Sequence, residues 1–412
     1  MLIETSVENY LSIKDKVTLS LDSSSSKKLL NNLVKTPKDE RLLKSAVIYG
    51  ANASGKSNMI KSVFFIWNMV KNSHLFNIDV KVPRVPFKLE EGYIDKPSKF
   101  EIIFIHNEIK YKYGFSCDNN KFIEEYLYHW PQGRESKIFT RKNSNEFDFT
   151  TDKKQQELIQ SQTNENVLYL SRATQLGYKG TREAYNFIVN NLVINYSPVW
   201  EEMTIKKIYE DNDLKDKIIE ILQKADFGGI MDIKVVKDKK KVQGFEFKVG
   251  KEETLFNPLK PEEQEFYDFK FVHKTKSGKL IDFEFNEESN GTRRTLAMLG
   301  PIFEILELGK VAFIDEFELN LHSNITKFLI KLFNSKLNKK NAQLIFTTHD
   351  TTLLDNEIFR RDQIYICSKN KDNSSKLNSY IDYNLREDSD FERAYLNGRV
   401  GGLPFIDETI FD

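Results

Sequence analysis

The glycine-rich segment at residues 50–57 is the feature that most narrowly limits what this chain can fold into. Its sequence, GANASGKS, satisfies the pattern G-x-x-x-x-G-K-[ST] through Gly50, Gly55, Lys56 and Ser57. A β-rich run, SAVIY, precedes it, and apolar residues recur at helical spacing after it. Strand, glycine loop and helix in this order are the context that a phosphate-binding loop requires. We therefore predict such a loop here and disfavour an ordinary glycine turn.

This loop predicts the contacts of a bound nucleotide. The N–H groups of the loop and of the following helix start would face the phosphates. Lys56 would add a positive charge, and the Ser57 hydroxyl would ligate Mg²⁺. The expected cofactors are therefore ATP and Mg²⁺. The residues expected to contact the nucleotide in this segment are Gly50, Asn52, Gly55, Lys56, Ser57 and Asn58.

The segment KVAFIDEFELNLH, residues 310–322, supplies the acids that such a site needs. Its apolar run VAFI is typical of a buried parallel strand and ends in Asp315 and Glu316. We expect Asp315 to hold the Mg²⁺ ion and Glu316 to act as the general base on the attacking water. The alternative is an ordinary strand followed by acidic loop residues, which the phosphate-binding loop upstream makes less favoured.

A third strand end carries a histidine. In AQLIFTTHD, residues 342–350, an apolar strand ends in threonines and His349. A lone histidine is most often a structural residue. Ligands in open α/β sheets, however, lie beyond the carboxyl ends of the strands, and all three segments end there. We therefore expect His349 to reach the γ-phosphate and to join Lys56 and Glu316 in catalysis.

A small polar turn, Ser289–Thr292, opens a predicted helix that begins near Arg293. A helix start of this kind can receive an anion. Because the glycine loop already holds the phosphates of its own chain, a second such helix start suggests a contact with the nucleotide of another copy. The residues expected there are Ser289, Gly291 and Thr292.

This ordered set resembles the ABC-type ATPases of the SMC-like and OLD-like branch. Residues 50–57 are similar to Walker A, 289–292 to a degenerate signature motif, 311–316 to Walker B, 318–322 to the D-loop and His349 to the switch histidine. The opening VENYLSIKD resembles the opening of the same branch. The segments RRDQIYICSKN, residues 360–370, and YLNGRVGGLPFID, residues 395–407, resemble the tail motifs of defence ATPases of the AbiL, RloA and PARIS types. The resemblance implies a head-to-tail dimer with each ATP between Walker A of one copy and the signature of the other.

Two departures from the family pattern matter. The signature reads SNGT, where transporters have LSGGQ, which fits the soluble branch better than a pump. The region VPRVPFKLEEG, residues 82–92, contains no glutamine for a Q-loop. How the nucleotide would be coupled to an accessory lobe is therefore left open.

The chain as a whole is expected to be an α/β P-loop NTPase with an ABC-type head, an antiparallel β lobe and a mostly helical insertion. Period-two alternation over 98–128 predicts a β-hairpin or meander. Helical patterns follow over 150–226, without the sustained heptads of a coiled-coil arm. The expected domains are 1–149 and 272–412 for the two halves of the head, and 150–271 for the insertion.

The charge and cysteine content of the chain limit the classes of partner that we expect it to bind. With 61 basic and 61 acidic residues the net charge is zero, which argues against a dedicated polyanion binder. The basic runs 234–243 and 270–279 favour a solvated hairpin, with a nucleic-acid contact left open. The two cysteines suit a reducing cytosol, and no segment is apolar and long enough to span a bilayer. We expect a cytoplasmic protein without a membrane partner.

Three functions were weighed against these features. The favoured one is a dimeric ATPase that senses a trigger, either a nucleic acid or a phage protein, and gates a separately encoded effector, expected to be a nuclease, in anti-phage defence. The second is a DNA-repair or chromosome-maintenance ATPase that acts directly on DNA. A transporter subunit ranks last, because it would want LSGGQ and a Q-loop.

Overall fold

A computed structural model describes residues 1–36, 40–195, 200–225, 229–242, 245–249, 254–258, 262–383, 385–386 and 389–403. The chain divides into two compact units. The first comprises Met1–Tyr196, Ile305–Leu319 and Thr326–Asp412, and the second comprises Ser197–Glu304 and Asn320–Ile325. None of the helices in the described ranges combines the length and the apolar character needed to cross a bilayer.

A largely parallel sheet forms the centre of the first unit. Its order is β11-β17-β18-β5-β19-β20, and only β20 runs antiparallel to its neighbour. These strands are β5 (Ser45–Tyr49), β11 (Leu192–Asn195), β17 (Val311–Ile314), β18 (Gln343–Thr347), β19 (Ile364–Lys369) and β20 (Ser375–Ser379). All residues of β5, β17 and β18 are buried, as expected for continuous apolar runs in a parallel sheet.

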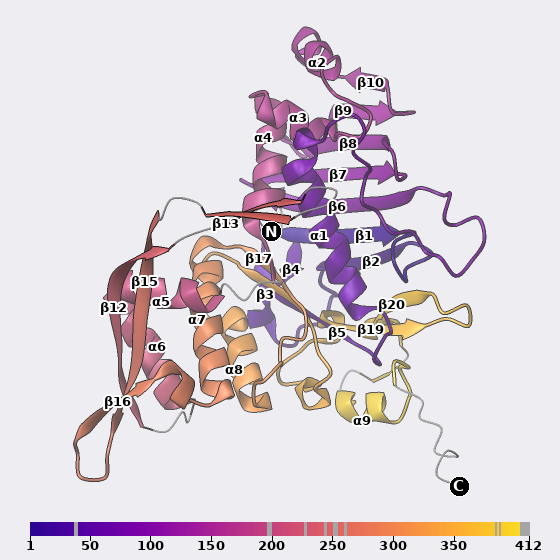
Figure 1. Cartoon of the computed structure of the whole chain (residues 1–412). Helices are drawn as coiled ribbons and strands as arrows, with labels where there is room; N and C mark the ends of the chain where they lie inside the picture. The colour runs from indigo at the N-terminus through magenta and orange to yellow at the C-terminus, as the bar shows by residue number, and fades with distance from the viewer. Residues whose placement is uncertain are drawn as a thin grey trace. The chain divides into compact units, whose positions relative to one another are not determined.

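An antiparallel sheet forms the second layer of this unit. Its order is β10-β9-β8-β7-β6-β1-β2, and Figure 1 shows it as a ladder of strands. The strands are β1 (Leu2–Glu8), β2 (Val17–Ser20), β6 (Ser98–His106), β7 (Ile109–Cys117), β8 (Phe122–Trp130), β9 (Ser136–Lys142) and β10 (Glu146–Phe149). The meander predicted over 98–128 is confirmed by β6, β7 and β8.

Helix α1 (Lys56–Asn72) contributes to the hydrophobic core that both sheets share. The Phe65 ring lies 4.7 Å from the Phe100 ring of β6, centroid to centroid. Met59, Ile60 and Val63 on the same helix are fully or almost fully buried. Because α1 starts where β5 and the glycine loop end, this packing fixes the position of the loop.

Shorter elements complete the first unit. They are β3 (Leu33–Lys35), β4 (Arg41–Leu43), α2 (Lys153–Gln160), α3 (Tyr169–Gln175), α4 (Lys179–Asn186) and α9 (Phe391–Leu396). Short 3₁₀ helices occur at Leu30–Asn32, Ser73–Leu75, Thr351–Leu353, Arg361–Gln363 and Tyr380–Asp382.

The helical expectation over 150–226 needs one correction. After α4 the chain forms a short π-helix, Phe187–Asn191, and then strand β11, which pairs in parallel with β17. The run LVIN is rich in β-branched residues, which favour a strand once a neighbouring strand is available. Residues 150–195 thus belong to the first compact unit, although the sequence analysis grouped them with an insertion that ends at residue 271.

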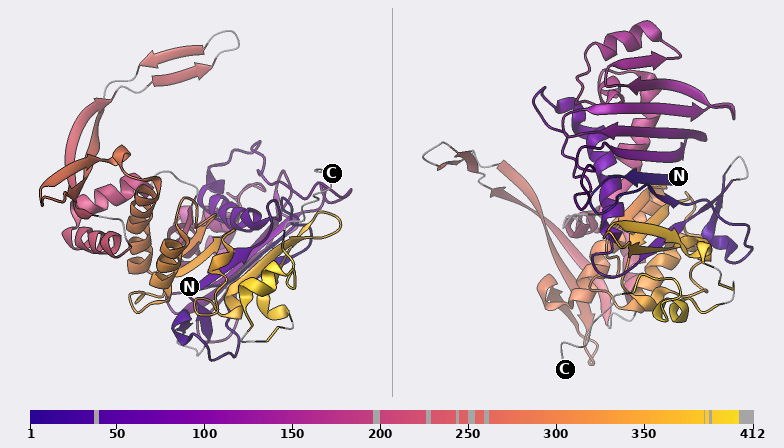
Figure 2. Two further views of the ribbon diagram at one scale, coloured as in Figure 1. Left: turned by 90° about the horizontal axis from the view of Figure 1, so that it is seen from below. Right: turned by 90° about the vertical axis from the view of Figure 1, so that its right-hand side faces the viewer.

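The second unit packs helices on a small antiparallel sheet. Its strands are β12 (Ile230–Val242), β15 (Glu262–Lys274) and β16 (Leu280–Glu284), with a separate hairpin of β13 (Phe245–Val249) and β14 (Thr254–Pro258). Figure 2 shows β12 and β15 as one long, curved pair. Helices α5 (Trp200–Glu210) and α6 (Asn212–Lys224) cover this sheet, and the 3₁₀ helix Phe285–Glu287 follows β16.

Helices α7 (Asn290–Leu308) and α8 (Ser323–Asn334) each begin in the second unit and end in the first. Thr204 of α5 donates to the Ala297 carbonyl of α7 at 2.9 Å. Gly300 permits this approach, since a Cβ there would lie 2.3 Å from the Thr204 hydroxyl. The parallel sheet of the first unit, together with helix α1 and the antiparallel sheet, confirms the predicted α/β fold with an antiparallel lobe.

Candidate functional site

The segment Gly50–Gly55 joins the buried strand β5 to helix α1, as predicted. Gly55 has a φ of +112°, in the left-handed region, and a Cβ there would lie 2.1 Å from the Ser375 hydroxyl. A Cβ on Gly50 would lie 2.2 Å from the Cys367 carbonyl oxygen. Both glycines of the motif are therefore required by the backbone path and by the close approach of β19 and β20.

Helix α1 starts at Lys56, and no side chain caps the N–H groups of its first turn, although the Asn58 amide donates to the Gly55 carbonyl at 3.0 Å. The Lys56 ammonium is buried and folds back over the loop. Its Nζ donates to the carbonyls of Gly50 at 2.8 Å and Ala51 at 3.1 Å. Burial lowers the pKa of Lys56, and nearby groups that include Asp315 and Glu318 act in the opposite direction. The cation is thus placed at the mouth of the loop.

A set of serine contacts braces the loop from distant segments. Ser375 Oγ lies 2.5 Å from the Ser54 carbonyl oxygen, to which it donates, and 2.7 Å from Ser12 Oγ. Asn58 donates to Ser12 Oγ at 2.6 Å. Cys367 Sγ also donates to the Ser54 carbonyl, at 3.3 Å. The sequence analysis missed Ser12 and Ser375, and their only signal was a hydroxyl near each end of the chain.

Strand β17 ends in the predicted acids, and the neighbouring strand holds them. The Thr347 hydroxyl donates to Asp315 Oδ1 at 2.5 Å and accepts from the Glu316 amide at 2.8 Å. Glu316 has a φ of +48° and its side chain is exposed. A left-handed residue other than glycine costs on the order of 1–3 kcal/mol and persists where its surroundings enforce it. Thr347 is the residue that enforces it here.

His349 follows β18 with its side chain exposed. Its backbone N–H donates to Glu318 Oε1 at 2.6 Å. Glu318 Oε2 is buried and has no hydrogen-bond partner among the described residues. Glu318 therefore connects the segment after β17 with the segment after β18, a role that the sequence analysis did not assign to it.

The structure brings most of the predicted residues into one open cleft of about 520 Å³. Those that line it are Asn52, Gly55, Lys56, Ser57, Asn58, Glu316 and His349, together with Ala53, Ser54 and Lys61. Gly50 and Asp315 are not among the residues that line the cleft. The Gly50 carbonyl accepts a hydrogen bond from Lys56, and Asp315 accepts one from Thr347. Three loops from three strand ends thus converge, as the position of ligands in open α/β sheets predicts.

The predicted signature residues belong to the second compact unit. Helix α7 begins at Asn290, three residues before the expected start at Arg293, because the Ser289 hydroxyl accepts from the Thr292 amide at 3.1 Å and caps the helix. Ser289 and Asn290 are exposed, whereas Thr292 is buried. A Cβ on Gly291 would meet nothing closer than 3.7 Å.

The basic runs lie beside carboxylates. Lys237 pairs with Glu265 and Lys270 with Glu284, each at 2.7 Å across neighbouring strands. Lys234 of β12 pairs with Asp282 of β16 at 2.7 Å, across the intervening strand β15. Gln243, in the first run, is outside the described residues. These three lysines are therefore compensated by carboxylates, and the preference for a solvated hairpin over a nucleic-acid contact stays a prediction.

Ser57 and Asp315 are the oxygen donors that the site offers to Mg²⁺. This ion takes oxygen ligands and usually keeps several waters, being held by one or two carboxylates and by substrate phosphates. Ser57 and Asp315 offer a hydroxyl and a carboxylate, and the Oδ1 atom of Asp315 is already oriented by Thr347. Within the described ranges, no group of three His, Cys, Asp or Glu side chains could hold a metal ion by itself. These residues therefore fit an ion that is held jointly with a nucleotide.

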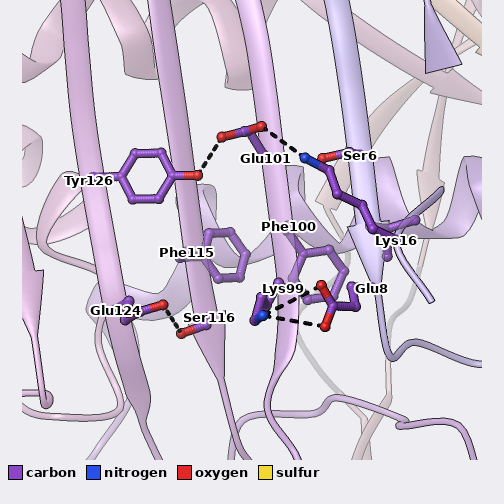
Figure 3. A pocket seen from close by; sticks show the side chains of 11 residues that line it. Ser6, Glu8, Lys16, Lys99, Phe100, Glu101, Phe115, Ser116, Glu124 and Tyr126 are labelled. Carbon is purple, nitrogen blue, oxygen red and sulfur yellow. Dashed lines mark hydrogen bonds and ion pairs between the residues drawn. The ribbon is translucent and has the colours of Figure 1, made fainter. Parts of the chain in front are cut away.

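A different pocket opens on the antiparallel sheet, as Figure 3 shows. Tyr126 donates to Glu101 at 2.5 Å, and Lys99 pairs with Glu8 at 3.3 Å. Burial acts to raise the pKa of Glu101, but hydrogen bonds from Tyr126 and Lys112 outweigh it and lower this pKa. The charges of this pocket are compensated internally, which makes it less suited to a phosphate than the cleft at Lys56.

Comparisons with known proteins add a family and a general likeness. Residues 45–355 match a family model described as "AAA domain, putative AbiEii toxin, Type IV TA system". The chain is similar to an SMC head bound to the C-winged helix domain of ScpA, with 15% identity and a TM-score of 0.45, over 92% of this chain and 97% of that one.

It is also similar to the SMC head domain from Thermotoga maritima, with 12% identity and a TM-score of 0.40, over 92% of this chain and 98% of that one. No curated protein matches the sequence.

Proposed function

This chain belongs to that family of AAA domains, and on this premise we propose that it is a Mg²⁺-dependent ATPase of the ABC type. The observation that carries the proposal is the single cleft lined by Lys56, Ser57, Glu316 and His349. A phosphate-binding loop, a carboxylate and a histidine at neighbouring strand ends are the parts that hydrolysis of ATP requires.

The roles follow from the contacts. Phosphate oxygens of ATP would replace the Gly50 and Ala51 carbonyls as acceptors for Lys56. Ser57 and Asp315 would hold Mg²⁺, which when bound supplies positive charge against the phosphates. Glu316, exposed in the cleft, would take a proton from the attacking water. His349 would donate a hydrogen bond towards the γ-phosphate.

We further propose that a second copy of the chain completes the ATP-binding site. The cleft is open to solvent, and Ser289 and Asn290 form an exposed, anion-receptive helix start. In a head-to-tail dimer this helix start would contact the γ-phosphate held by the partner, as the resemblance to ABC-type ATPases implies. ATP binding would then close the dimer and hydrolysis would open it.

A mixing experiment tests this arrangement. Lys56→Ala should abolish ATP binding, and Gly291→Arg should block the partner's nucleotide while leaving its own fold intact, because the nearest atoms to a Cβ at Gly291 are 3.7 Å away. Each variant alone should be inactive. Mixed at equal concentrations, they form one site with an intact Lys56 and an intact Gly291, so ATPase activity should reappear. A mixture that stays inactive, although the chains associate, would refute a site shared between copies.

The biological role that we propose is control of a separately encoded effector, expected to be a nuclease, in anti-phage defence. The family description names a toxin of a toxin–antitoxin system, which supports a defence role and not chromosome maintenance. The dimer would respond to a nucleic acid or a phage protein. Cells that carry the gene with its neighbours should restrict phage, and Lys56→Ala should remove the restriction. Restriction by this variant at the wild-type level would contradict the role of ATP.

A further inference from the structure

Two sequence features that the nucleotide site does not use meet in one cleft. One is the serine run at 23–26, and the other is the pair of arginines at 360–361 that opens RRDQIYICSKN. Ser24, Ser25, Ser26, Lys28, Arg360 and Arg361 line this cleft. Its volume is about 280 Å³, near the lower end of the range of roughly 300–1,000 Å³ that small-molecule sites occupy.

The serine loop is built around a buried ion pair. Arg360 is 3% exposed and pairs with Asp362 through Nη2 at 2.8 Å and Nε at 2.9 Å. The same guanidinium donates to the Ser26 carbonyl at 3.1 Å and to the Lys28 carbonyl. Asp362 in turn accepts from the Ser24 amide at 2.7 Å and the Ser24 hydroxyl at 2.6 Å. The loop therefore has a fixed shape, although its composition resembles that of a linker.

Positive charge remains at this cleft after the buried pair is counted. The Arg360 charge is compensated by Asp362, but Arg361 donates to the Tyr383 carbonyl at 3.0 Å and forms no ion pair within the described ranges. Its Nε is buried and has no hydrogen-bond partner among those residues. Among the residues that the structure describes, no carboxylate side chain lines the cleft. The Arg361 guanidinium and the serine hydroxyls at this opening match the oxygens of a phosphate.

The other wall is apolar. Phe359 and Phe391 are buried beneath the surface, and the Ile381 side chain is 41% exposed at the edge. A bare inorganic ion would leave this wall unused. An organic phosphate would place its charged end at Arg361 and its carbon skeleton against Ile381. The two walls together thus select a ligand that has both a phosphate group and a carbon skeleton.

This cleft is separate from the ATP site. Arg360 and Arg361 directly precede β19, whereas the glycine loop follows β5, and these two strands are parallel neighbours. The arginines therefore lie at the amino end of the sheet and the ATP cleft lies at the carboxyl end. No residue lines both clefts.

We propose that the cleft formed by the serine run, Arg361 and Ile381 binds a small phosphorylated organic molecule of the phosphomonoester class. The phosphate lies between Arg361 and the serine hydroxyls, and the sugar or ring lies on Ile381. This site is independent of ATP hydrolysis, so it stands even if the chain turns out not to be an ATPase.

Titration calorimetry on the Lys56→Ala protein tests the site, because this substitution removes phosphate binding at the glycine loop. The probes are AMP, ribose 5-phosphate and inorganic phosphate. At least one organic probe should bind with a measurable Kd. Arg361→Gln should weaken that binding at least about tenfold, and Ile381→Ser should weaken the organic probe more than inorganic phosphate.

Arg134→Gln is the matched control, since Arg134 is exposed in the turn between β8 and β9. It should leave binding unchanged, and thermal unfolding should show that all variants fold. The proposal is overturned if neither organic probe binds, if Arg361→Gln binds as tightly as Arg134→Gln, or if inorganic phosphate binds as tightly as both organic probes.

Discussion

Thr347 donates its hydroxyl to Asp315 Oδ1 at 2.5 Å, across the boundary between strands β18 and β17. Because the same oxygen accepts from the Glu316 amide, one side chain orients the proposed magnesium ligand and holds the backbone of the proposed base. Groups that orient metal ligands in this way commonly change metal affinity or activity by about 10–100-fold when they are removed.

Thr347→Val should therefore lower the ATP hydrolysis rate by about 10–100-fold while the chain still binds ATP through Lys56. The substitution keeps the shape of the side chain and removes both hydrogen bonds. Thr347→Ser, which keeps the hydroxyl, should restore most of the rate. Steady-state hydrolysis and nucleotide binding, measured side by side, check this. Equal rates for the valine and serine variants would exclude a role for the hydroxyl.

Gly55→Ala should abolish ATP binding, because a Cβ there would lie 2.1 Å from the Ser375 hydroxyl and 2.8 Å from the Ser12 hydroxyl. Gly133→Ala is the matched control. Gly133 also has a positive φ, +78°, but a Cβ there meets nothing within 4 Å. The control should lose only about 1–2 kcal/mol of stability from backbone strain. ATP binding of Gly55→Ala at wild-type affinity would contradict the close packing of Ser375 on the loop.

Arg141→Met should lower the free energy of unfolding by about 3–5 kcal/mol at pH 8, because it leaves the buried Glu125 without its cation. Burial raises the pKa of Glu125, and Arg141 acts to lower it. The variant's Glu125 pKa should therefore be higher still.

A carboxyl whose folded pKa exceeds its unfolded value takes up a proton more readily in the folded state, so stability is lost as the pH rises through the folded pKa. The decrease in the free energy of unfolding caused by Arg141→Met should thus be smaller at pH 5 than at pH 8, as thermal unfolding at both pH values would show. Arg134→Met, at an exposed arginine, should show neither effect. A pH-independent loss would mean that Glu125 is not the group responsible.

The sequence predicted the parts of the site whose chemistry dictates residue type and whose flanks dictate structure. Gly55, Lys56 and Glu316 each follow or begin an element with a clear apolar pattern, so their position in the sheet could be inferred. The pairing of Ser12 with Ser375 could not, because the two residues are 363 positions apart and serines carry no distinctive signal.

Local competition explains the remaining differences. The run FIVNNLVIN allows both helix and strand, and pairing with β17 decides in favour of β11 for its last four residues. The signature helix starts early because the Ser289 hydroxyl caps the Thr292 amide, a bond that depends on one side-chain rotamer. The ion pairs that compensate Lys234 and Lys237 depend on strand register, which a single sequence leaves open.

The central claim, that two copies close on ATP, is tested most directly by the mass of Glu316→Gln in solution. This variant keeps Lys56 and Ser57 and loses the proposed base, so it should bind ATP without hydrolysing it. Light scattering after size exclusion should give twice the 48.2 kDa chain mass with ATP and the single-chain mass without it. Adding Gly291→Arg should return the ATP-bound protein to the single-chain mass. If Glu316→Gln binds ATP and still elutes as a single chain, the shared site is contradicted.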